Sequence, residues 1–240
     1  MLTHFSDQCA LRKPCTQPNA CYFWPMPQNA FAHVNEWVFD LDNTLYPPAM
    51  RLFDQIEMKM RGFMVDTLGI DDAEANYLRK HYWEVHGTTL AGLMREHGIQ
   101  AEPFLTEVHD ISFDALQPDP DLASLIKNLP GRSIVYTNGT KPYAEQVLAA
   151  RGLDGVFDAI YGIEHADYIP KPERNAFDRV FGQDGLTHKN AAMFEDEVRN
   201  LEVPHAMGLR TVHVAPEPSG EDYVHFHTDD LTAFLRQISG

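Results

Sequence analysis

Short apolar segments alternate with amphipathic helices through the second half of this chain, and that alternation limits the possible folds more than any other feature. The apolar segments predicted to be strands are 133–136, 157–161, 191–194 and 211–214. The helices predicted before and between them are 121–129, 142–151, 172–181 and 200–207. Strands joined through helices pair in parallel, with right-handed crossovers. The sequence therefore predicts an α/β fold with a Rossmann-like parallel sheet as its core.

A helical block interrupts this pattern near its start. Residues 37–39 form a buried apolar segment that predicts a first strand, and Pro47-Pro48 ends it. Apolar residues then recur at steps of three and four from residue 52 to 68, which predicts the first of several helices. We expect an all-helical cap domain, inserted after the first strand. The predicted domains are an irregular N-terminal extension at 1–34, a core at 35–46 and 117–240, and the cap at 47–116.

The net charge of the chain disfavours some classes of binding partner. Of its 240 residues, 35 are Asp or Glu and 19 are Lys or Arg, so the formal net charge is −16. This sign disfavours nucleic-acid polymers and anionic membrane surfaces as partners. The sequence contains no run of about 18 apolar residues that would predict a membrane-spanning helix. We expect neither a nucleic-acid polymer nor a membrane as partner, and either a monomer or a homodimer.

The cysteines favour a reducing compartment. Cys9, Cys15 and Cys21 all lie in the N-terminal extension. Their odd number does not fit the disulfide framework of a secreted protein, and their spacing does not match common zinc sites. The first residues also lack the apolar stretch of a signal peptide. We therefore predict a cytoplasmic protein in which these thiols are incidental.

Polar side chains directly follow three of the predicted strands. In open parallel sheets, ligands bind beyond the carboxyl ends of the strands, so these side chains are expected to meet at one edge. Lys171, in a loop before a predicted helix, is expected to face the same edge. The residues at the strand ends are Asp40 and Asp42, Thr137 and Asn138, and Glu195 and Asp196.

The crowding of carboxylates at this edge predicts a cation. Several carboxylates in one place repel one another unless a positive charge compensates, and oxygen ligands without His or Cys favour Mg²⁺. A phosphoryl group could then be bound by Mg²⁺, Lys171, the Thr137 hydroxyl and loop N–H groups. The predicted metal ligands are Asp40, Asp42, Glu195 and Asp196. The loop residues predicted to bind substrate are Leu41, Asn138 and Gly139.

The two aspartates after the first strand are expected to divide the catalytic work. We predict that Asp40 is both a metal ligand and the nucleophile, because aspartate nucleophiles form aspartyl-phosphate intermediates. The chain turns at the strand end, so Asp42 can point towards the leaving group. It would protonate the leaving oxygen and then deprotonate the water that hydrolyses the intermediate. Its backbone carbonyl could also bind the metal.

These motifs, in this order, resemble the four motifs of the haloacid dehalogenase-like hydrolase superfamily. The resemblance implies the same core fold, a helical cap and Mg²⁺-dependent chemistry, and it extends from residue 37 to about 214. The matching motifs are Asp40-Leu41-Asp42-Asn43-Thr44-Leu45, Thr137-Asn138-Gly139, Lys171-Pro172, and Glu195-Asp196 with Asn200. Glu195 departs from the pattern, since Asp is frequent there. This departure makes Asp196 the expected direct ligand, with Glu195 acting through water.

The sequence around these motifs resembles the pyrimidine 5′-nucleotidase branch of the superfamily. The resembling segments are 39–47, 87–93 in the cap and 136–139. This resemblance implies a phosphomonoester hydrolase for nucleoside monophosphates such as UMP and CMP, so the expected partner is a small phosphorylated metabolite. The alternatives are a phosphatase for phosphoglycolate or a sugar phosphate, a haloacid dehalogenase, and a non-catalytic binding protein. Asp42 disfavours the dehalogenase, because a halide leaving group needs no general acid.

Several polar and aromatic side chains allow both a structural and a functional interpretation. The cap residues Tyr77, His81, Tyr82 and Trp83 could pack the helical bundle or stack on a base, and packing is favoured for most. His86, Thr88 and Thr89 could face the cleft. His225 and His227 lie two residues apart, but a solvated strand or loop explains them better than a metal site.

Overall fold

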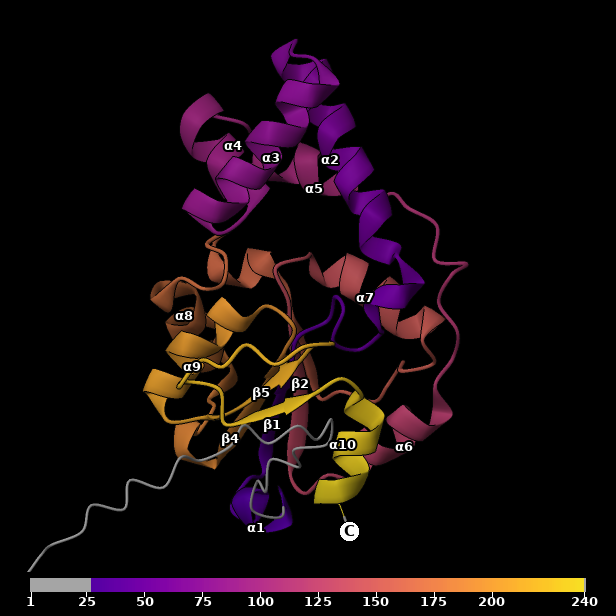
Figure 1. Ribbon diagram of the computed structural model, residues 1–240, viewed down its shortest axis with the longest axis vertical. Coiled ribbons are helices and arrows are strands. Elements are labelled where there is room, and N and C mark those ends of the chain that lie inside the picture. Colours follow the sequence, from indigo (N-terminus) through magenta and orange to yellow (C-terminus); the bar gives the residue numbers. More distant parts are fainter. Residues whose placement is uncertain (1–26, 240) are drawn as a thin grey trace, which may run out of the picture.

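The computed structural model describes residues 27–239. Most of the predicted N-terminal extension, including all three cysteines, lies outside these residues. The described end of that extension is not irregular throughout, because it contains a short helix, α1 (Pro27–Phe31). The ring of Phe31 lies 6.0 Å from that of Trp37 and 5.1 Å from that of Phe226. These contacts hold α1 against the core at the end opposite the helical block (Figure 1).

The described residues form a six-stranded parallel sheet with strand order β3-β2-β1-β4-β5-β6, which confirms the predicted α/β fold. The first strand lies inside the sheet, with β2 hydrogen-bonded on one side and β4 on the other. The other parallel pairs are β2 with β3, β4 with β5, and β5 with β6, and the connection from β3 to β4 crosses from one side of β1 to the other. The strands are β1 (Glu36–Phe39), β2 (Arg132–Tyr136), β3 (Ala159–Tyr161), β4 (Ala191–Glu195), β5 (Arg210–Val214) and β6 (Phe226–Thr228).

Side chains of β1 alternate between two buried faces of the sheet, as the two-residue period of a strand requires. Trp37 and Phe39 belong to one hydrophobic cluster, and Val38 belongs to another on the opposite face. The first cluster includes side chains of α6 (Pro120–Lys127), α7 (Lys141–Ala150) and α10 (Leu231–Ile238). The second includes side chains of α8 (Arg174–Asp184) and α9 (Glu202–Met207). Burial on both faces explains why β1 is a continuous apolar run.

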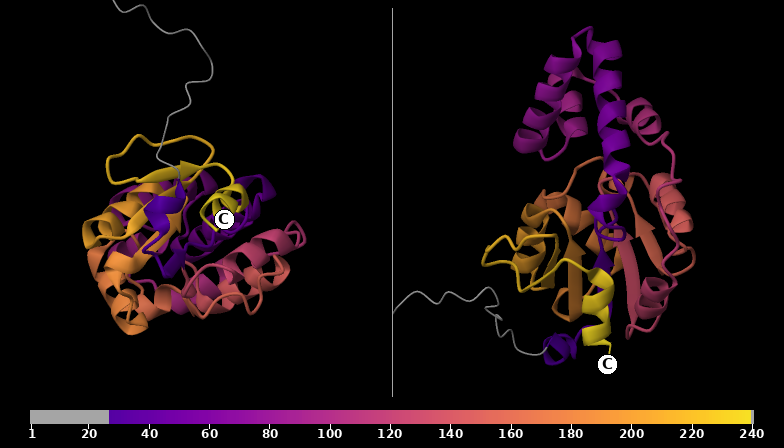
Figure 2. Two further views of the ribbon diagram at one scale, coloured as in Figure 1. Left: turned by 90° about the horizontal axis from the view of Figure 1, so that it is seen from below. Right: turned by 45° about the vertical axis from the view of Figure 1, so that its right-hand side comes forward.

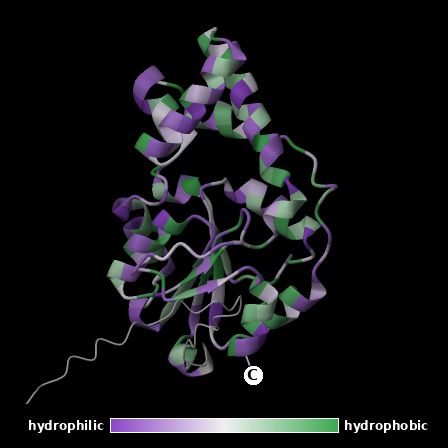
Figure 3. Cartoon of the chain, in the orientation of Figure 1, coloured by the Kyte–Doolittle hydropathy of each residue, from purple (hydrophilic) through white to green (hydrophobic). Residues whose placement is uncertain are grey.

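Four helices follow β1 and form the helical block, residues 47–116. Figures 1 and 2 show this block beyond one end of the sheet, with α2 running from the core into it. The helices are α2 (Leu52–Leu68), α3 (Asp72–His86), α4 (Thr89–His97) and α5 (Ala101–Val108). Hydrophobic and hydrophilic bands alternate along them in Figure 3, as in helices that bury one face. Within residues 27–239, no helix has both the length and the apolar content that crossing a membrane requires.

Arg151, which follows α7, contacts both segments that connect the sheet to the helical block. Its Nε donates to the carbonyl oxygen of Leu45 at 3.2 Å, just before the block. Its Nη2 donates to a carboxylate oxygen of Asp119 at 3.0 Å, and Nη1 donates to the carbonyl of Gln117, both just after the block. Because Arg151 is buried, its side chain holds the two connecting segments close together.

The predicted elements up to residue 214 are all present, with ends that differ by a few residues, but β6 and α10 were not predicted. β6 has three residues, of which only Phe226 is buried, so it offers no readable alternation. α10 does carry a helical signal. Its apolar residues Leu231, Phe234 and Leu235 are spaced for one face, and the Asp230 side chain accepts from the Ala233 N–H at 2.9 Å as an N-cap.

We predict that Gly92→Ala destabilises the protein by about 1–3 kcal/mol, because α4 packs so closely on α3 that an added Cβ would overlap the Tyr82 ring. Gly62→Ala is the matched control. Gly62 is exposed within α2, and a Cβ there would meet nothing within 4 Å, so this change should stabilise by about 0.5–1 kcal/mol. Urea unfolding measures the free energy of unfolding of both variants. Equal changes in that free energy would contradict the close packing of α4 on α3.

Candidate active site

Parallel pairing brings three polar strand ends together at the edge of the sheet that faces the helical block. Asp40 directly follows β1, Thr137 follows β2, and Glu195 ends β4. Since β1 pairs with both β2 and β4, and Phe39 lies opposite Val135 and Phe194, the residues that follow are neighbours in space. All three residues line one cavity. The predicted convergence therefore follows directly from the strand order.

Lys171 enters this edge from a loop and is 1% exposed. Its Nζ lies 2.7 Å from Oδ1 of Asp40, 2.6 Å from Oε2 of Glu195, and 3.1 Å from the carbonyl oxygen of Tyr136. These contacts use all three donor hydrogens of the ammonium group. Burial opposes the charge, but the two carboxylates outweigh it and raise the pKa of Lys171 above its usual range. The lysine therefore stays protonated beside Asp40.

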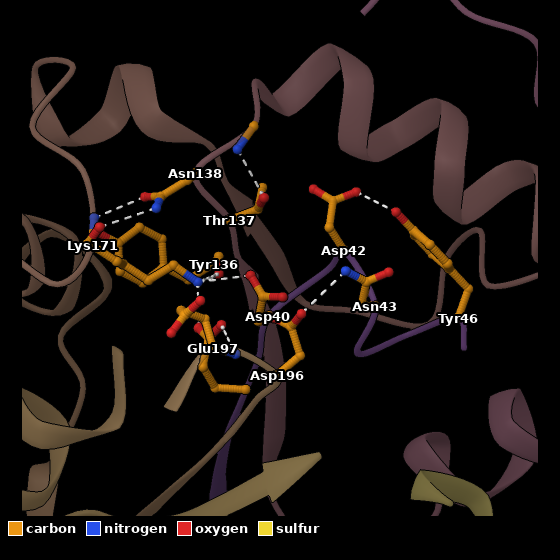
Figure 4. A network of polar contacts seen from close by, with 12 residues as sticks. Asp40, Asp42, Asn43, Tyr46, Tyr136, Thr137, Asn138, Lys171, Asp196 and Glu197 are labelled. Atoms are coloured by element: carbon orange, nitrogen blue, oxygen red, sulfur yellow. Dashed lines mark hydrogen bonds and ion pairs between the residues drawn. The ribbon is translucent and has the colours of Figure 1, made fainter. Parts of the chain in front are cut away.

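Asn138 holds the backbone of Lys171 in place. Its side-chain oxygen accepts from the Lys171 N–H at 2.8 Å, and its side-chain nitrogen donates to the Lys171 carbonyl at 3.2 Å (Figure 4). Both ends of the amide are thus engaged by the loop, although Asn138 also lines the cavity. Its predicted contact with substrate stays a prediction. The structure adds that Asn138 positions the lysine.

Three carboxylates crowd the same place as Lys171. Oxygen atoms of Asp40, Glu195 and Asp196 all lie within 4.8 Å of one another. Burial, followed by repulsion from Glu195, raises the pKa of Asp40 to about 7, although Lys171 opposes this shift. Burial, followed by the charges of Asp40 and Glu195, likewise raises the pKa of Asp196 well above its usual range. One ammonium group does not balance three carboxylates, so the cluster favours a further positive charge.

The donor set of this cluster fits a hard divalent cation. All three groups offer carboxylate oxygens, which are the ligands that Mg²⁺ prefers. Asp196 is oriented by Asn43, whose side-chain nitrogen donates to Oδ2 at 3.2 Å. Glu195 is more fully engaged, because Oε2 contacts Lys171 and Oε1 accepts from the Glu197 N–H at 3.3 Å. This difference is consistent with the expectation that Asp196 binds the metal directly while Glu195 acts through water.

Asp42 stands apart from the carboxylate cluster. Its Oδ1 accepts hydrogen bonds from the hydroxyls of Tyr46 and Tyr143, each at 2.6 Å. Burial, followed by repulsion from Asp40, raises the pKa of Asp42 to about 6, and the two tyrosines oppose this shift. The side chain of Asp42 is not one of the clustered ligands, so a role in metal binding would rest on its backbone carbonyl, as predicted.

The remaining predicted residues lie around Asp40 and Thr137. The Thr137 hydroxyl is buried and accepts from the Gly139 N–H at 2.9 Å, so that N–H is already engaged. A Cβ at Gly139 would approach Cδ1 of Tyr143 to 2.8 Å, which explains why a glycine fits here. The Leu41 N–H bonds to the Asp40 carboxylate and lowers its pKa, while the Leu41 side chain is buried. Substrate contacts of Leu41 and Gly139 stay predictions.

The cavity has a volume of about 500 Å³ and extends from the strand ends into the helical block. This size is within the range of small-molecule sites. Thr88, Thr89 and Trp83 line it, whereas His86 does not. The guanidinium of Arg199 lies 3.9 Å from the centre of the Trp83 ring and donates to the Trp83 carbonyl, which ties α3 to the core.

The other aromatic side chains of α3 do not line the cavity. Tyr82 is buried, and its hydroxyl lies 2.6 Å from Nε2 of His97, so it packs the bundle. Tyr77 is 65% exposed and its ring stacks on that of His81. Neither His225 nor His227 belongs to a group of three metal-binding side chains among the described residues.

Sequence reasoning missed the groups that orient the site. Tyr46, Tyr143 and Asn43 contact Asp42 and Asp196, yet no role was predicted for any of them. Asn43 did offer a signal, because it directly follows the strand-end aspartates and Asn is common in turns. In the structure it adopts the left-handed backbone that Asn tolerates, with φ 59°. Tyr143 offered none, since an aromatic residue in a helix usually packs.

The fold and the site together define a hydrolase of the haloacid dehalogenase-like class. The family model of haloacid dehalogenase-like hydrolases matches residues 37–208, more than half of the chain. The chain therefore belongs to this family.

A yeast protein is similar to much of this chain. Phosphate metabolism protein 8 of Saccharomyces cerevisiae is 27% identical over 203 residues, which are 77% of this chain and 61% of that protein. The chain thus spans about three fifths of its yeast relative.

Solved structures share the fold. CbbY from Rhodobacter sphaeroides, in complex with phosphate, gives a TM-score of 0.61 at 18% identity, over 86% of this chain and all of that one (100%). The hydrolase YfnB from Bacillus subtilis, bound to magnesium, gives 0.56 at 17% identity, over 85% and 98%. At these identities the likeness establishes the fold alone.

We predict that Mg²⁺ raises the melting temperature of the protein, because binding to the folded state alone stabilises by about 2.7 kcal/mol at 100 times Kd. Asp196→Asn should abolish this gain and raise the melting temperature in EDTA, since it removes one repelling carboxylate. Asp154→Asn, which neutralises an exposed carboxylate, is the control and should keep the gain. An Asp196→Asn protein that still responds to Mg²⁺ like the wild type would contradict the assignment.

Proposed function

We propose that this chain is a Mg²⁺-dependent phosphomonoester hydrolase that acts through an aspartyl-phosphate intermediate. The observation that carries the proposal is the arrangement of two aspartates with different partners. Asp40 lies in the carboxylate cluster against Lys171, and Asp42 lies outside that cluster against two tyrosine hydroxyls. One aspartate is thus placed beside positive charge, and the other is free to exchange protons.

Asp40 is the proposed nucleophile. Its carboxylate attacks phosphorus while the bond from phosphorus to the leaving oxygen breaks. The ammonium of Lys171, 2.7 Å from Oδ1, keeps a positive charge where the phosphoryl oxygens gather, and the Thr137 hydroxyl lines the same cavity. Mg²⁺ held by Asp40, Asp196 and the Asp42 carbonyl would neutralise charge on the phosphoryl group. Glu195 holds Lys171 from the other side.

Asp42 is the proposed general acid and base. With its pKa raised to about 6, both protonation states are accessible near neutral pH. It gives its proton to the leaving oxygen in the first step. In the second step it takes a proton from the water that attacks phosphorus and frees Asp40. The tyrosines hold Oδ1, so the other carboxylate oxygen is the one that exchanges protons.

The same arrangement favours phosphate esters over haloacids. A halide leaves without a proton, so a dehalogenase would make no use of an aspartate held as Asp42 is. A non-catalytic scaffold would not require the buried Lys171 and three carboxylates, which are costly to assemble. The phosphate complex of CbbY and the name of the yeast relative agree with phosphate chemistry.

For the substrate, we propose a pyrimidine nucleoside 5′-monophosphate. The support is the sequence resemblance of segments 39–47, 87–93 and 136–139, together with a cavity that continues past the strand ends into the helical block. In this proposal residues 47–116 form a cap domain that excludes water and contacts the leaving group. The rival is another small metabolite phosphate, such as phosphoglycolate or a sugar phosphate.

A substrate screen tests the proposal. With Mg²⁺, the protein should release phosphate from UMP and CMP with kcat/KM at least about 10-fold above that for phosphoglycolate or ribose 5-phosphate. Asp40→Asn should lower kcat by about 10⁴-fold or more, as loss of a nucleophile does. Equal rates across the substrates would overturn the pyrimidine assignment, and absence of Mg²⁺-dependent phosphate release from all of them would overturn the phosphatase.

The role of the tyrosine pair gives a separate prediction. Tyr143→Phe removes one of the two donors that orient Asp42, so general acid catalysis should weaken. We expect kcat to fall by about 10-fold for an alkyl phosphate, whose leaving oxygen needs a proton, and much less for p-nitrophenyl phosphate. Tyr161→Phe is the control, because that hydroxyl bonds to Asp184, which does not line the cavity. Equal losses on both substrates would indicate that Tyr143 does not position the acid.

A further inference from the structure

The part of the cavity that lies in the helical block has a largely apolar wall. α2 presents Phe53, Ile56 and Met60 to it, at the spacing of one helical face. α5, which packs against α2, contributes Phe104, Leu105 and Val108 to the same lining. A mostly apolar group would suit such a lining. The strand ends carry the charge that a phosphoryl group needs, so this apolar part is left for the rest of the substrate.

A charged pair is set into this wall. Glu57 lies on the same face of α2, and its Oε1 is 2.9 Å from Nη1 of Arg79 on α3. Both residues line the cavity, and their side chains are 40% and 12% exposed. A charged pair that is partly removed from water gains little net stability from its own attraction. Stability alone therefore gives a weak reason for placing this pair at the cavity wall.

The guanidinium of Arg79 has donor capacity that its neighbours do not use. Nη1 bonds to Glu57, and Nη2 bonds to the side-chain oxygen of Asn76 at 3.3 Å. Nε is buried and has no hydrogen-bond partner among the described residues. Nε itself is too buried for a ligand to reach, but Nη1 and Nη2 each carry a second N–H. Because the Arg79 side chain lines the cavity and is partly exposed, those N–H groups can donate to a ligand. The Arg79 backbone is fixed by α4, since the Thr89 hydroxyl donates to its carbonyl at 3.2 Å.

We propose that Arg79 and Glu57 determine specificity by recognising the polar edge of a planar ring in the leaving group. Arg79 donates to a ring acceptor, which is a carbonyl oxygen in uracil and the ring nitrogen in cytosine. Glu57 accepts from the neighbouring ring N–H or amino group, while the apolar side chains of α2 and α5 contact the ring. A pyrimidine base has such an edge, with acceptor and donor side by side. The inference rests on the proposed function and adds the residues that select its substrate.

A purely structural role for the pair is the competing explanation, because Glu57 and Arg79 also join α2 to α3. The chain offers a matched control for that role. Arg61 on α2 pairs with Asp72 on α3 at 3.3 Å, and neither residue lines the cavity. If joining the two helices were all that mattered, loss of either pair would act on every substrate alike.

The test compares UMP with ribose 5-phosphate, which has the same sugar and phosphoryl group but no base. Steady-state kinetics use the Mg²⁺-loaded protein. Arg79→Gln should lower kcat/KM for UMP by about 10- to 100-fold, the effect of losing a charged hydrogen bond, and leave ribose 5-phosphate nearly unchanged. Arg61→Gln should leave the ratio of the two kcat/KM values unchanged. Equal losses on both substrates in Arg79→Gln would overturn the proposal.

Exchanging the two charged residues separates a role in recognising the substrate from a role in holding α2 against α3. The double variant Glu57→Arg with Arg79→Glu can re-form the pair, so its melting temperature should recover relative to the single variants, but the preference for UMP should not. Recovery of the preference would overturn the proposal.

Calorimetry of UMP binding to the Asp40→Asn protein tests the role of Arg79 and Glu57 separately from the proposed phosphatase activity. Loss of binding in the Arg79→Gln background supports the pair even if the wild-type protein releases no phosphate. Unchanged binding overturns it.

Discussion

The buried contact of Lys171 with Asp40 and Glu195 is the interaction on which this edge of the sheet depends. Parallel pairing of β1 with β2 and β4 brings the strand-end carboxylates together, whether or not their charges are balanced. A buried ammonium with all its hydrogens engaged offsets part of that repulsion. Burial and the remaining repulsion from Glu195 together raise the pKa of Asp40, and this uncompensated negative charge is the physical reason that the cluster suits a divalent cation.

The reactive groups are oriented by partners from distant parts of the sequence. Asn138 fixes the loop that carries Lys171, Tyr143 of α7 holds Asp42, and Asn43 holds Asp196. Each partner is an uncharged hydrogen-bond donor or acceptor, so it fixes direction without adding to the charge imbalance. The sheet edge thus provides the chemistry, while the helical block contributes most of the apolar wall that the leaving group would contact.

The sequence predicts the fold and the meeting of the polar strand ends well, because both follow from periodic signals. Apolar segments of strand length followed by Asp40, Thr137 or Glu195 specify a sheet edge before any contact is known. The orienting and selecting residues cannot be predicted in this way. Tyr143 and Glu57 occupy helix positions whose spacing suits packing as well as function, and only the contact with Asp42 or with Arg79 separates the two roles. β6 was missed because three residues carry no period.

The helical block lies between two paired strands, and this position determines how much its length can change without destabilising the core. Glu36 pairs with Arg132, so the first contact between β1 and β2 closes a loop that contains the whole block. Loop-closure entropy grows only with the logarithm of length, and doubling a loop of roughly a hundred residues costs about 0.6 kcal/mol. Arg151 further reduces the effect of the insertion by joining its two ends. The core can therefore accept blocks of very different sizes while its own stability, and the chemistry at its edge, stay almost constant.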